Sequence, residues 1–274
     1  MRVALILISC FLSSALLSQE TRIVTEKDPH ATYREREEKE FRFYPGGRMT
    51  IASKVPGEVR ILGWDKGTVR VEAEKVYTGS SSESAKPVFE KHPLRVRYNQ
   101  TSAKIDVDGH PDDDQTIACN LTIYVPGYKT DLQATLDRGD ISVKGVNGWI
   151  EASTNEGRLE AVSLAGYFSG RTQKGDIRVE MSGRRWNGLE LGAVTRLGAI
   201  DLVLPEDYSA SLQIETLDGN VLVDYPPQMV DGEPVDLNVG IRKKAQAIDA
   251  SIGSGGAPIK LISQAGDVRL SAKR

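Results

Sequence analysis

Glycine recurs at a fixed interval through the middle of this chain. Glycines occupy positions 139, 148, 157, 166 and 175, so each follows the previous one by nine residues. An internal period this regular is typical of repeat proteins and restricts the possible folds before any other feature is considered. Around every second glycine, apolar residues alternate with polar ones, as they do along a strand that buries one face. The pattern predicts short strands joined by tight turns.

The repeating unit can be written as apolar-x-apolar-x-Thr-x-x-Gly-x-apolar-x-apolar. It is matched at 150–161, 168–179, 191–202, 212–223 and 259–270, and at 132–143 with leucine in the threonine position. A unit of this length cannot bury its apolar positions alone, so we expect the units to stack on one another. The expected fold class is all-β: a β-solenoid, or single-stranded β-helix-like stack of strand-turn-strand repeats.

Two positions of the unit are assigned to the turn. Glycine accepts a positive φ without steric strain, and a threonine or serine hydroxyl can hydrogen-bond turn backbone. The predicted turn glycines are Gly139, Gly157, Gly175, Gly198, Gly219 and Gly266. The predicted turn hydroxyls belong to Thr154, Thr172, Thr195, Thr216 and Ser263. Both sets are structural predictions.

One unit contains the tripeptide Arg138-Gly139-Asp140, which many cell-adhesion ligands present to integrins. In the repeat, Asp140 occupies the same position as Asp176 and Asp267, while Arg138 fills a variable turn position. The repeat therefore accounts for the tripeptide, and motifs of three residues often match by chance. We interpret it as part of a turn and not as an integrin ligand.

The N-terminus has the composition of a secretory signal peptide. Met1-Arg2 precedes the uncharged segment 3–17, which is shorter than the roughly 20 apolar residues that span a membrane. Cleavage is expected near 15–18, which leaves no membrane span and predicts a periplasmic, cell-surface or secreted protein. Residues 7–10 also spell a lipobox, so lipid attachment at Cys10 is the alternative; apolar residues continue beyond this cysteine, which favours plain cleavage.

The expected organisation has three parts. A signal peptide occupies 1–18, a charged and poorly ordered lead-in occupies 19–39, and one domain occupies 40–274. Within this domain we expect a looser front half at 40–130, regular repeats at 131–224, an insertion at 226–246 and a last repeat at 257–272. We also expect a solvated loop at 78–86 and one long strand at 116–134.

The sequence contains few candidates for a chemical site. The formal net charge of −3 provides no basic excess, so no nucleic acid partner is expected. Cys119, the one cysteine left after cleavage, is expected to be a buried small hydrophobe; pairing of two chains is the alternative. The three histidines lack metal-ligand spacing and are expected at the surface: His30, His92 and His110. No catalytic, cofactor-binding or metal residue is predicted, and no cofactor.

An acidic segment at 106–115 begins like a calcium-binding loop. Its twelfth position is Ile117, where such a loop requires glutamate. We therefore expect a solvated hairpin loop in place of a calcium site.

The chain resembles the bacterial putative-adhesin domain family. The resemblance rests on 56–75, on 124–143 and on the serial Thr-x-x-Gly units, and it covers about 40–272. It implies a β-solenoid-like fold outside the cytoplasm and supplies no catalytic residues. The chain departs from the family at 226–246, which separates the last unit from the others.

We expect an exported, non-enzymatic, adhesin-like binding or scaffold module of the bacterial cell envelope or surface. Its partner would be a protein or glycan there, bound on strand faces with charged side chains such as Glu160, Arg178, Glu180, Lys260 and Arg269. The alternative is a carbohydrate-active enzyme on a solenoid scaffold that uses the turn aspartates, since glycosidases place two carboxylates about a cleft.

Overall fold

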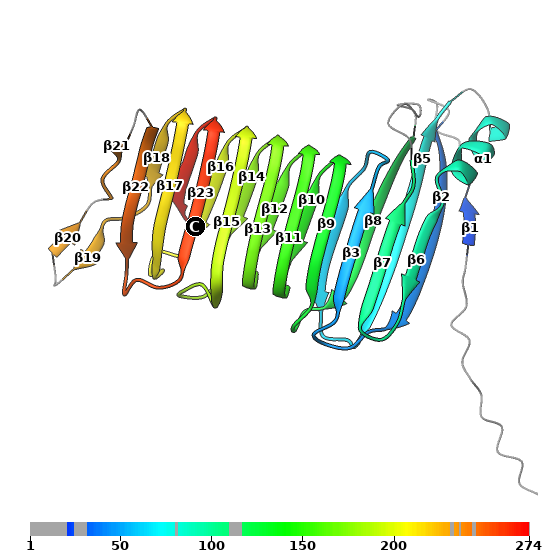
Figure 1. The fold of residues 1–274 in the computed structure, drawn as a ribbon, viewed down its shortest axis with the longest axis horizontal. Coiled ribbons are helices and arrows are strands. Elements are labelled where there is room, and N and C mark those ends of the chain that lie inside the picture. The colour runs from blue at the N-terminus through cyan, green and yellow to red at the C-terminus, as the bar shows by residue number, and fades with distance from the viewer. Residues whose placement is uncertain are drawn as a thin grey trace, which may run out of the picture.

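The described chain is almost entirely β-structure. The computed structural model describes residues 21–24, 32–79, 82–109, 117–230, 233–235, 237–242 and 245–273. The predicted signal peptide at 1–18 lies outside the described residues, as does most of the acidic segment at 106–115. Two large mixed sheets run along the molecule (Figure 1). The all-β prediction is confirmed.

The first sheet has eleven strands. Their order is β1 (Thr21–Val24), β2 (Thr32–Arg42), β5 (Thr68–Thr78), β8 (Ile117–Pro126), β4 (Val59–Trp64), β10 (Ile141–Lys144), β12 (Leu159–Val162), β14 (Ile177–Glu180), β16 (Ile200–Leu204), β24 (Val268–Ala272) and β18 (Val221–Asp224).

The second sheet also has eleven strands. Their order is β21 (Gly240–Arg242), β22 (Ala245–Ile252), β17 (Ala210–Asp218), β23 (Pro258–Ala265), β15 (Gly188–Leu197), β13 (Ala165–Lys174), β11 (Asn147–Glu156), β9 (Asp131–Arg138), β3 (Arg48–Ser53), β7 (Ser102–Val107) and β6 (Leu94–Tyr98). A hairpin of β19 (Gln228–Val230) and β20 (Glu233–Val235) belongs to neither sheet, and the described helix is α1 (Ser82–Lys91).

Each unit of the repeat contributes one long strand to the second sheet and one short strand to the first. Equivalent residues of successive units pair in parallel, so Leu132 lies beside Ile150 and Ile150 beside Phe168. In the first sheet, Leu159 lies between Ile141 and Ile177 in the same way. Because the register is kept, each position of the unit forms a row along the molecule.

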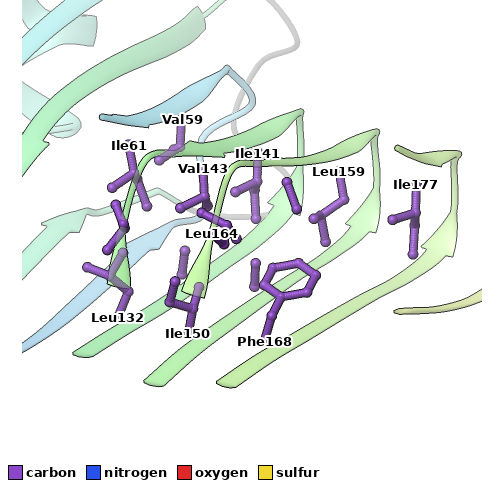
Figure 2. Packing of buried hydrophobic residues seen from close by; sticks show 14 of the residues in the cluster. Val59, Ile61, Leu132, Ile141, Val143, Ile150, Leu159, Leu164, Phe168 and Ile177 are labelled. Carbon is purple, nitrogen blue, oxygen red and sulfur yellow. The ribbon is translucent and has the colours of Figure 1, made fainter. Parts of the chain in front are cut away.

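The core lies between the two sheets, where alternate residues of every strand meet. Figure 2 shows Ile141, Leu159 and Ile177 from the first sheet and Ile150 and Phe168 from the second, all buried. The ring of Phe168 is far larger than the aliphatic side chains beside it. It occupies the space above Gly170, where a Cβ atom would lie 2.9 Å from the ring. A small residue at 170 thus accommodates a large one at 168.

The last unit is not last in space. Strands β23 and β24 lie between the β15–β16 unit and the β17–β18 unit, and they pair in parallel with both. The predicted insertion at 226–246 contains the β19–β20 hairpin, β21 and the first residues of β22. The chain leaves the stack after β18 through this segment and returns along β22, which pairs antiparallel with β17. It then enters β23, which pairs with β17 on the opposite side.

The predicted lead-in at 19–39 is wrong where the structure describes it. β1 pairs with β2, and β2 pairs with β5 along its whole length. The sequence of β2 is so rich in charge that its inward face was not recognised. On that face Glu35 and Glu37 accept hydrogen bonds at 2.8 and 2.9 Å from Nζ of Lys75, whose side chain is 3% exposed. The buried ion cluster replaces the apolar alternation that would have indicated a strand.

Two further predictions are corrected. The loop expected at 78–86 runs into α1, whose Ala85 and Phe89 are one turn apart and buried, with Phe89 edge-on to Tyr77. The single strand expected at 116–134 is two strands, β8 and β9. The turn between them is closed by the hydroxyl of Thr130, which donates to the Pro126 carbonyl at 2.6 Å.

His92 is buried and not on the surface as predicted, with Nδ1 lying 3.0 Å from the Asp108 carbonyl. His30 and His110 lie outside the described residues. The buried position predicted for Cys119 is confirmed, and its thiol is free.

Candidate functional site

The turn glycines stack into a column at one edge of the molecule. In spatial order the column is Gly57, Gly139, Gly157, Gly175, Gly198, Gly266 and Gly219, and a Cβ atom on each of the last six would overlap the carbonyl oxygen of the glycine before it. All except Gly219 have a positive φ, between 131° and 159°. Gly219 thus departs from the expected backbone geometry, although its place in the column leaves no room for a side chain.

The turn hydroxyls reach the neighbouring unit and not their own turn. Thr154 Oγ1 donates to the Gly139 carbonyl at 3.0 Å, although Thr154 belongs to the turn of Gly157. The same bond, between 2.8 and 3.2 Å, joins Thr172 to Gly157, Thr195 to Gly175, Ser263 to Gly198 and Thr216 to Gly266. All five threonine and serine residues are buried. In each bond, the hydroxyl and the glycine carbonyl therefore satisfy each other's hydrogen-bonding requirement away from water.

An aspartate follows three of these glycines, Gly139, Gly175 and Gly266. Asp140, Asp176 and Asp267 each accept a hydrogen bond from the backbone N–H of the residue stacked on them, at 2.8 to 2.9 Å. The carboxylate of Asp140 also accepts from the guanidinium of Arg158 at 3.0 and 3.1 Å. These carboxylates hold the stack together, and Asp140 of the Arg138-Gly139-Asp140 tripeptide is one of them.

The outer face of the first sheet carries a groove of about 510 Å³. Charged and polar side chains from β2, from β4 and the residue before it, and from β5 and β8 surround it: Arg36, Glu38, Glu58, Arg60, Glu72, Glu74, Asn120 and Thr122. Its charges are largely paired internally, since Arg36 binds Glu74 and Arg60 binds Glu58. No group of three or more metal-ligating side chains occurs among the described residues. The groove is thus an ionic surface whose carboxylates each have a cationic partner among the described residues.

The outer face of the second sheet carries a pair of stacked aromatic rings. Trp149 on β11 and Tyr167 on β13 lie with ring centroids 3.9 Å apart and planes inclined by 20°. Trp149 is 45% exposed, and its indole Nε1 donates to Glu151 at 3.0 Å. None of the residues predicted above belongs to this pair. Its signal was available, because the two residues occupy the same position of successive units.

Two shallow grooves adjoin the aromatic pair. The groove beside Tyr167 has a volume of about 340 Å³. Besides Tyr167, its polar lining consists of Gln133, Thr135, Glu151, Ser153, Ser169 and Arg171. The groove beside Trp149 has a volume of about 260 Å³. Besides Trp149, its polar lining consists of Arg48, Asp131, Gln133 and Glu151. Both grooves lie across β9 and β11, which are adjacent in Figure 1. We call them the Tyr167 groove and the Trp149 groove.

Cys119 does not belong to a reactive site. Burial is the main cause that raises the pKa of its thiol, to about 12, although the nearby Lys75 opposes the shift. A thiol is nucleophilic as the thiolate, which this pKa disfavours.

None of the helices that the structure describes is long and apolar enough to cross a membrane. No protein-family model matches the sequence, and no curated protein matches it.

Among solved structures, the chain is similar to a putative cell adhesion protein from Clostridium sporogenes. The identity is 9%, the match covers 87% of this chain and 100% of that one, and the TM-score is 0.44. A putative adhesin from Bacteroides fragilis matches at 9% identity over 87% of this chain and 97% of that one, with a TM-score of 0.26. A putative lipid binding protein from Parabacteroides distasonis matches at 12% identity over 86% and 96%, with a TM-score of 0.24.

At these identities and TM-scores the likeness assigns no ligand and no activity to this chain. Two of the three names are those of putative adhesion proteins, and the third is that of a putative lipid binding protein. In sequence pattern and in its solved structural neighbours, this chain resembles the putative adhesins of bacteria.

Proposed function

We propose that the chain is an exported, non-enzymatic, adhesin-like module that binds or scaffolds components of the bacterial cell envelope or surface. Its regular units at 131–224 and 257–272 form a β-solenoid in this proposal. The signal peptide at 1–18 is removed, so that the mature chain begins between 16 and 20. The partner is a protein or glycan, and not a nucleic acid.

The observation that carries the proposal is the in-register stacking of outward-facing side chains. Along the second sheet, Gln133, Glu151 and Ser169 form one row, while Thr135, Ser153 and Arg171 form the next. The glycine column and the hydroxyl bonds behind these rows hold successive units together. A rigid face with many polar groups in fixed positions binds a partner at small conformational cost.

The non-enzymatic part of the proposal rests on how the turn aspartates are used. Both carboxylate oxygens of Asp140 accept hydrogen bonds from Arg158, and one oxygen of Asp176 is bound to the N–H of Ala199. A glycosidase needs one carboxyl group as an acid and the second as a base or nucleophile about the scissile bond. Carboxylates committed to the stack are poorly suited to either role.

Co-sedimentation tests the binding function. The purified mature chain is mixed with isolated bacterial envelope fragments, and retention is measured against chain concentration. We expect saturable retention, while a heat-unfolded sample measures non-specific retention. The absence of saturable retention on peptidoglycan, membrane and surface-polysaccharide fractions alike would overturn the proposal.

An activity screen tests the enzymatic alternative. Soluble polysaccharides are incubated with the chain and with its Asp140→Ala and Asp176→Ala variants, and reducing ends are measured. We expect no release of reducing ends by any of the three. Cleavage by the parent chain that is lost in both variants would establish a carbohydrate-active enzyme in place of a binding module.

A further inference from the structure

We infer that the Trp149 groove and the Tyr167 groove together bind a neutral glycan, with consecutive pyranose rings of one chain lying in the two grooves. This inference rests on the proposed binding function and names its ligand class. The grooves lie on one sheet face, and Gln133 and Glu151 line both of them. A ligand that enters one groove can therefore continue into the other.

The aromatic pair supplies the apolar part of the recognition. One side of a pyranose ring presents C–H groups, and the electron-rich face of an aromatic ring attracts such groups. Trp149 and Tyr167 are stacked on each other, and each lines one groove. The stacking holds both rings in place, so that little side-chain entropy would be lost on binding.

Polar side chains supply the hydroxyl recognition. Within the described part of the chain, no hydrogen-bond partner engages the side chains of Gln133 and Arg171, and both are exposed. Glu151 uses one oxygen for the indole of Trp149, which leaves acceptor capacity directed to solvent. Sugar hydroxyls both donate and accept, so a set of amide, guanidinium and carboxylate groups matches them.

Short side chains form the floor of the Tyr167 groove. Thr135, Ser153 and Ser169 lie on three adjacent strands, and the longer Tyr167 and Arg171 rise beside them. The hydroxyl of Ser153 donates to that of Thr135 at 3.3 Å. This arrangement leaves a shallow hollow with a polar base, into which a ring can settle without displacing protein atoms.

A β-bulge extends the apolar edge of the site. The register of β13 and β15 shifts beside Tyr167, because Gly166 pairs with Gly188 while Tyr167 pairs with Glu190. Leu189 is the extra residue, and its side chain is 70% exposed. Bulges commonly redirect side chains next to binding sites. The row Trp149, Tyr167, Leu189 thus presents an apolar strip beside the polar side chains of the two grooves.

The charge of the two grooves favours a neutral ligand. Arg48 and Asp131 line the Trp149 groove, Arg171 lines the Tyr167 groove, and Glu151 lines both. Two guanidinium groups and two carboxylates leave no net charge. An acidic polysaccharide would gain little from this face, whereas an uncharged one loses nothing.

Binding of neutral hexasaccharides tests the inference. Cellohexaose, laminarihexaose, hexa-N-acetylchitohexaose, xylohexaose, mannohexaose and maltohexaose are titrated into the full mature chain by calorimetry. We expect at least one to bind, and Trp149→Ala and Tyr167→Ala each to weaken it by about fivefold to tenfold, the size of one aromatic contact. Arg171→Ala should weaken it as well. The matched controls are Tyr128→Ala and Arg196→Ala, which change an exposed tyrosine and arginine outside both grooves.

Each result decides the matter. If no hexasaccharide binds, or if the groove variants bind as well as the controls, the inference is overturned. Co-sedimentation with envelope fragments distinguishes failure of the glycan inference from failure of the proposed binding function. Retention that survives periodate oxidation of the fragments, is abolished by protease treatment of them and is unchanged by Trp149→Ala would mean a protein partner elsewhere, with the binding function intact. Retention abolished by periodate and by Trp149→Ala would support the glycan site.

Discussion

At the residue scale, the turn position of the repeat unit admits only glycine, because the glycine of the neighbouring unit occupies the space of a side chain. The carbonyl oxygen of each glycine lies where the side chain of the next would be. From Gly139 to Gly266 in the column, that oxygen also accepts a hydrogen bond from a buried threonine or serine. Steric exclusion and hydrogen bonding therefore act on the same backbone group. In the Arg138-Gly139-Asp140 tripeptide, Gly139 and Asp140 hold such positions, while Arg138 fills a variable one.

Replacement of Gly139 by alanine is expected to lower the free energy of unfolding by at least about 2 kcal/mol, because the backbone has φ of 131° and the new Cβ would overlap the Gly57 carbonyl. Thermal or urea unfolding measures the loss. Gly67→Ala is the first control, because no atom lies within 4 Å of its added Cβ. Arg138→Ala is the second, because Arg138 fills a variable turn position. Each control should change the free energy of unfolding by no more than about 0.5 kcal/mol. Equal losses at 139 and 67 would contradict the column.

Cys119 supplies a pH-dependent prediction. Its pKa is raised to about 12, so at pH 8 the folded protein holds almost no thiolate. Modification by a thiol reagent such as DTNB should be very slow in the folded chain. In denaturant the pKa returns to its ordinary value, about 8.5, and one thiol per mature chain should react promptly. Fast reaction of the folded protein at pH 8 would show that the side chain is accessible.

At the element scale, strand β2 shows that a buried face can be ionic. Burial lowers the pKa of Lys75, but the hydrogen bonds from its ammonium group to Glu35 and Glu37 raise it by more, so that Lys75 remains charged. The cluster joins β2 to β5 in the part of the first sheet that lies beyond the regular units. The highly charged strand β2 is held by these three side chains together with its backbone pairing to β1 and β5.

Lys75→Met is expected to destabilise the chain by about 3 kcal/mol, since it leaves two carboxylates together at a poorly hydrated site. The triple variant Lys75→Met, Glu35→Gln, Glu37→Gln removes both unpaired charges and should recover at least half of that loss. Equilibrium denaturation of the three proteins measures this difference. A triple variant no more stable than Lys75→Met would show that the charges are not the source of the effect.

At the scale of the whole molecule, the order of the regular repeat units in space differs from their order in sequence at one place. The unit formed by β23 and β24 fills the space between two units that precede it along the chain. The C-terminal segment is therefore an interior layer of the stack. Strands β17 and β18 depend on it for their parallel partners.

A chain that ends at 256 lacks this interior layer and is expected to melt at a temperature lower by more than about 10 °C, or to fail to fold. Differential scanning calorimetry measures the change. The matched control shortens the chain within the β19–β20 hairpin: Gln228 and Val235 are paired, so residues 229–234 can be replaced by Asn-Gly. That hairpin belongs to neither sheet, and its loss should change the melting temperature little. A truncated chain that melts with the parent would refute the interior layer.

Local pattern was sufficient for much of this architecture. Alternation within single segments predicted which residues of β9 to β16 face inward, and the recurrence of glycine located the turns, because both depend on the pleat and on allowed backbone angles within a few residues. The same period would also have brought Trp149 and Tyr167 together. The helix α1 and the strand β2 were missed because their buried faces are short or charged.

Only the tertiary structure decided which strands are neighbours. Units such as those at 191–202, 212–223 and 259–270 have nearly the same apolar profile, so each could stack against either of the others with similar local energy. The choice depends on how the whole chain closes, including the path through 226–246 and the antiparallel return of β22. The burial of Lys75 among carboxylates has the same origin. It becomes favourable only when β2, β5 and β8 meet, since charges separated along the sequence stabilise one another only after the fold has removed the water between them.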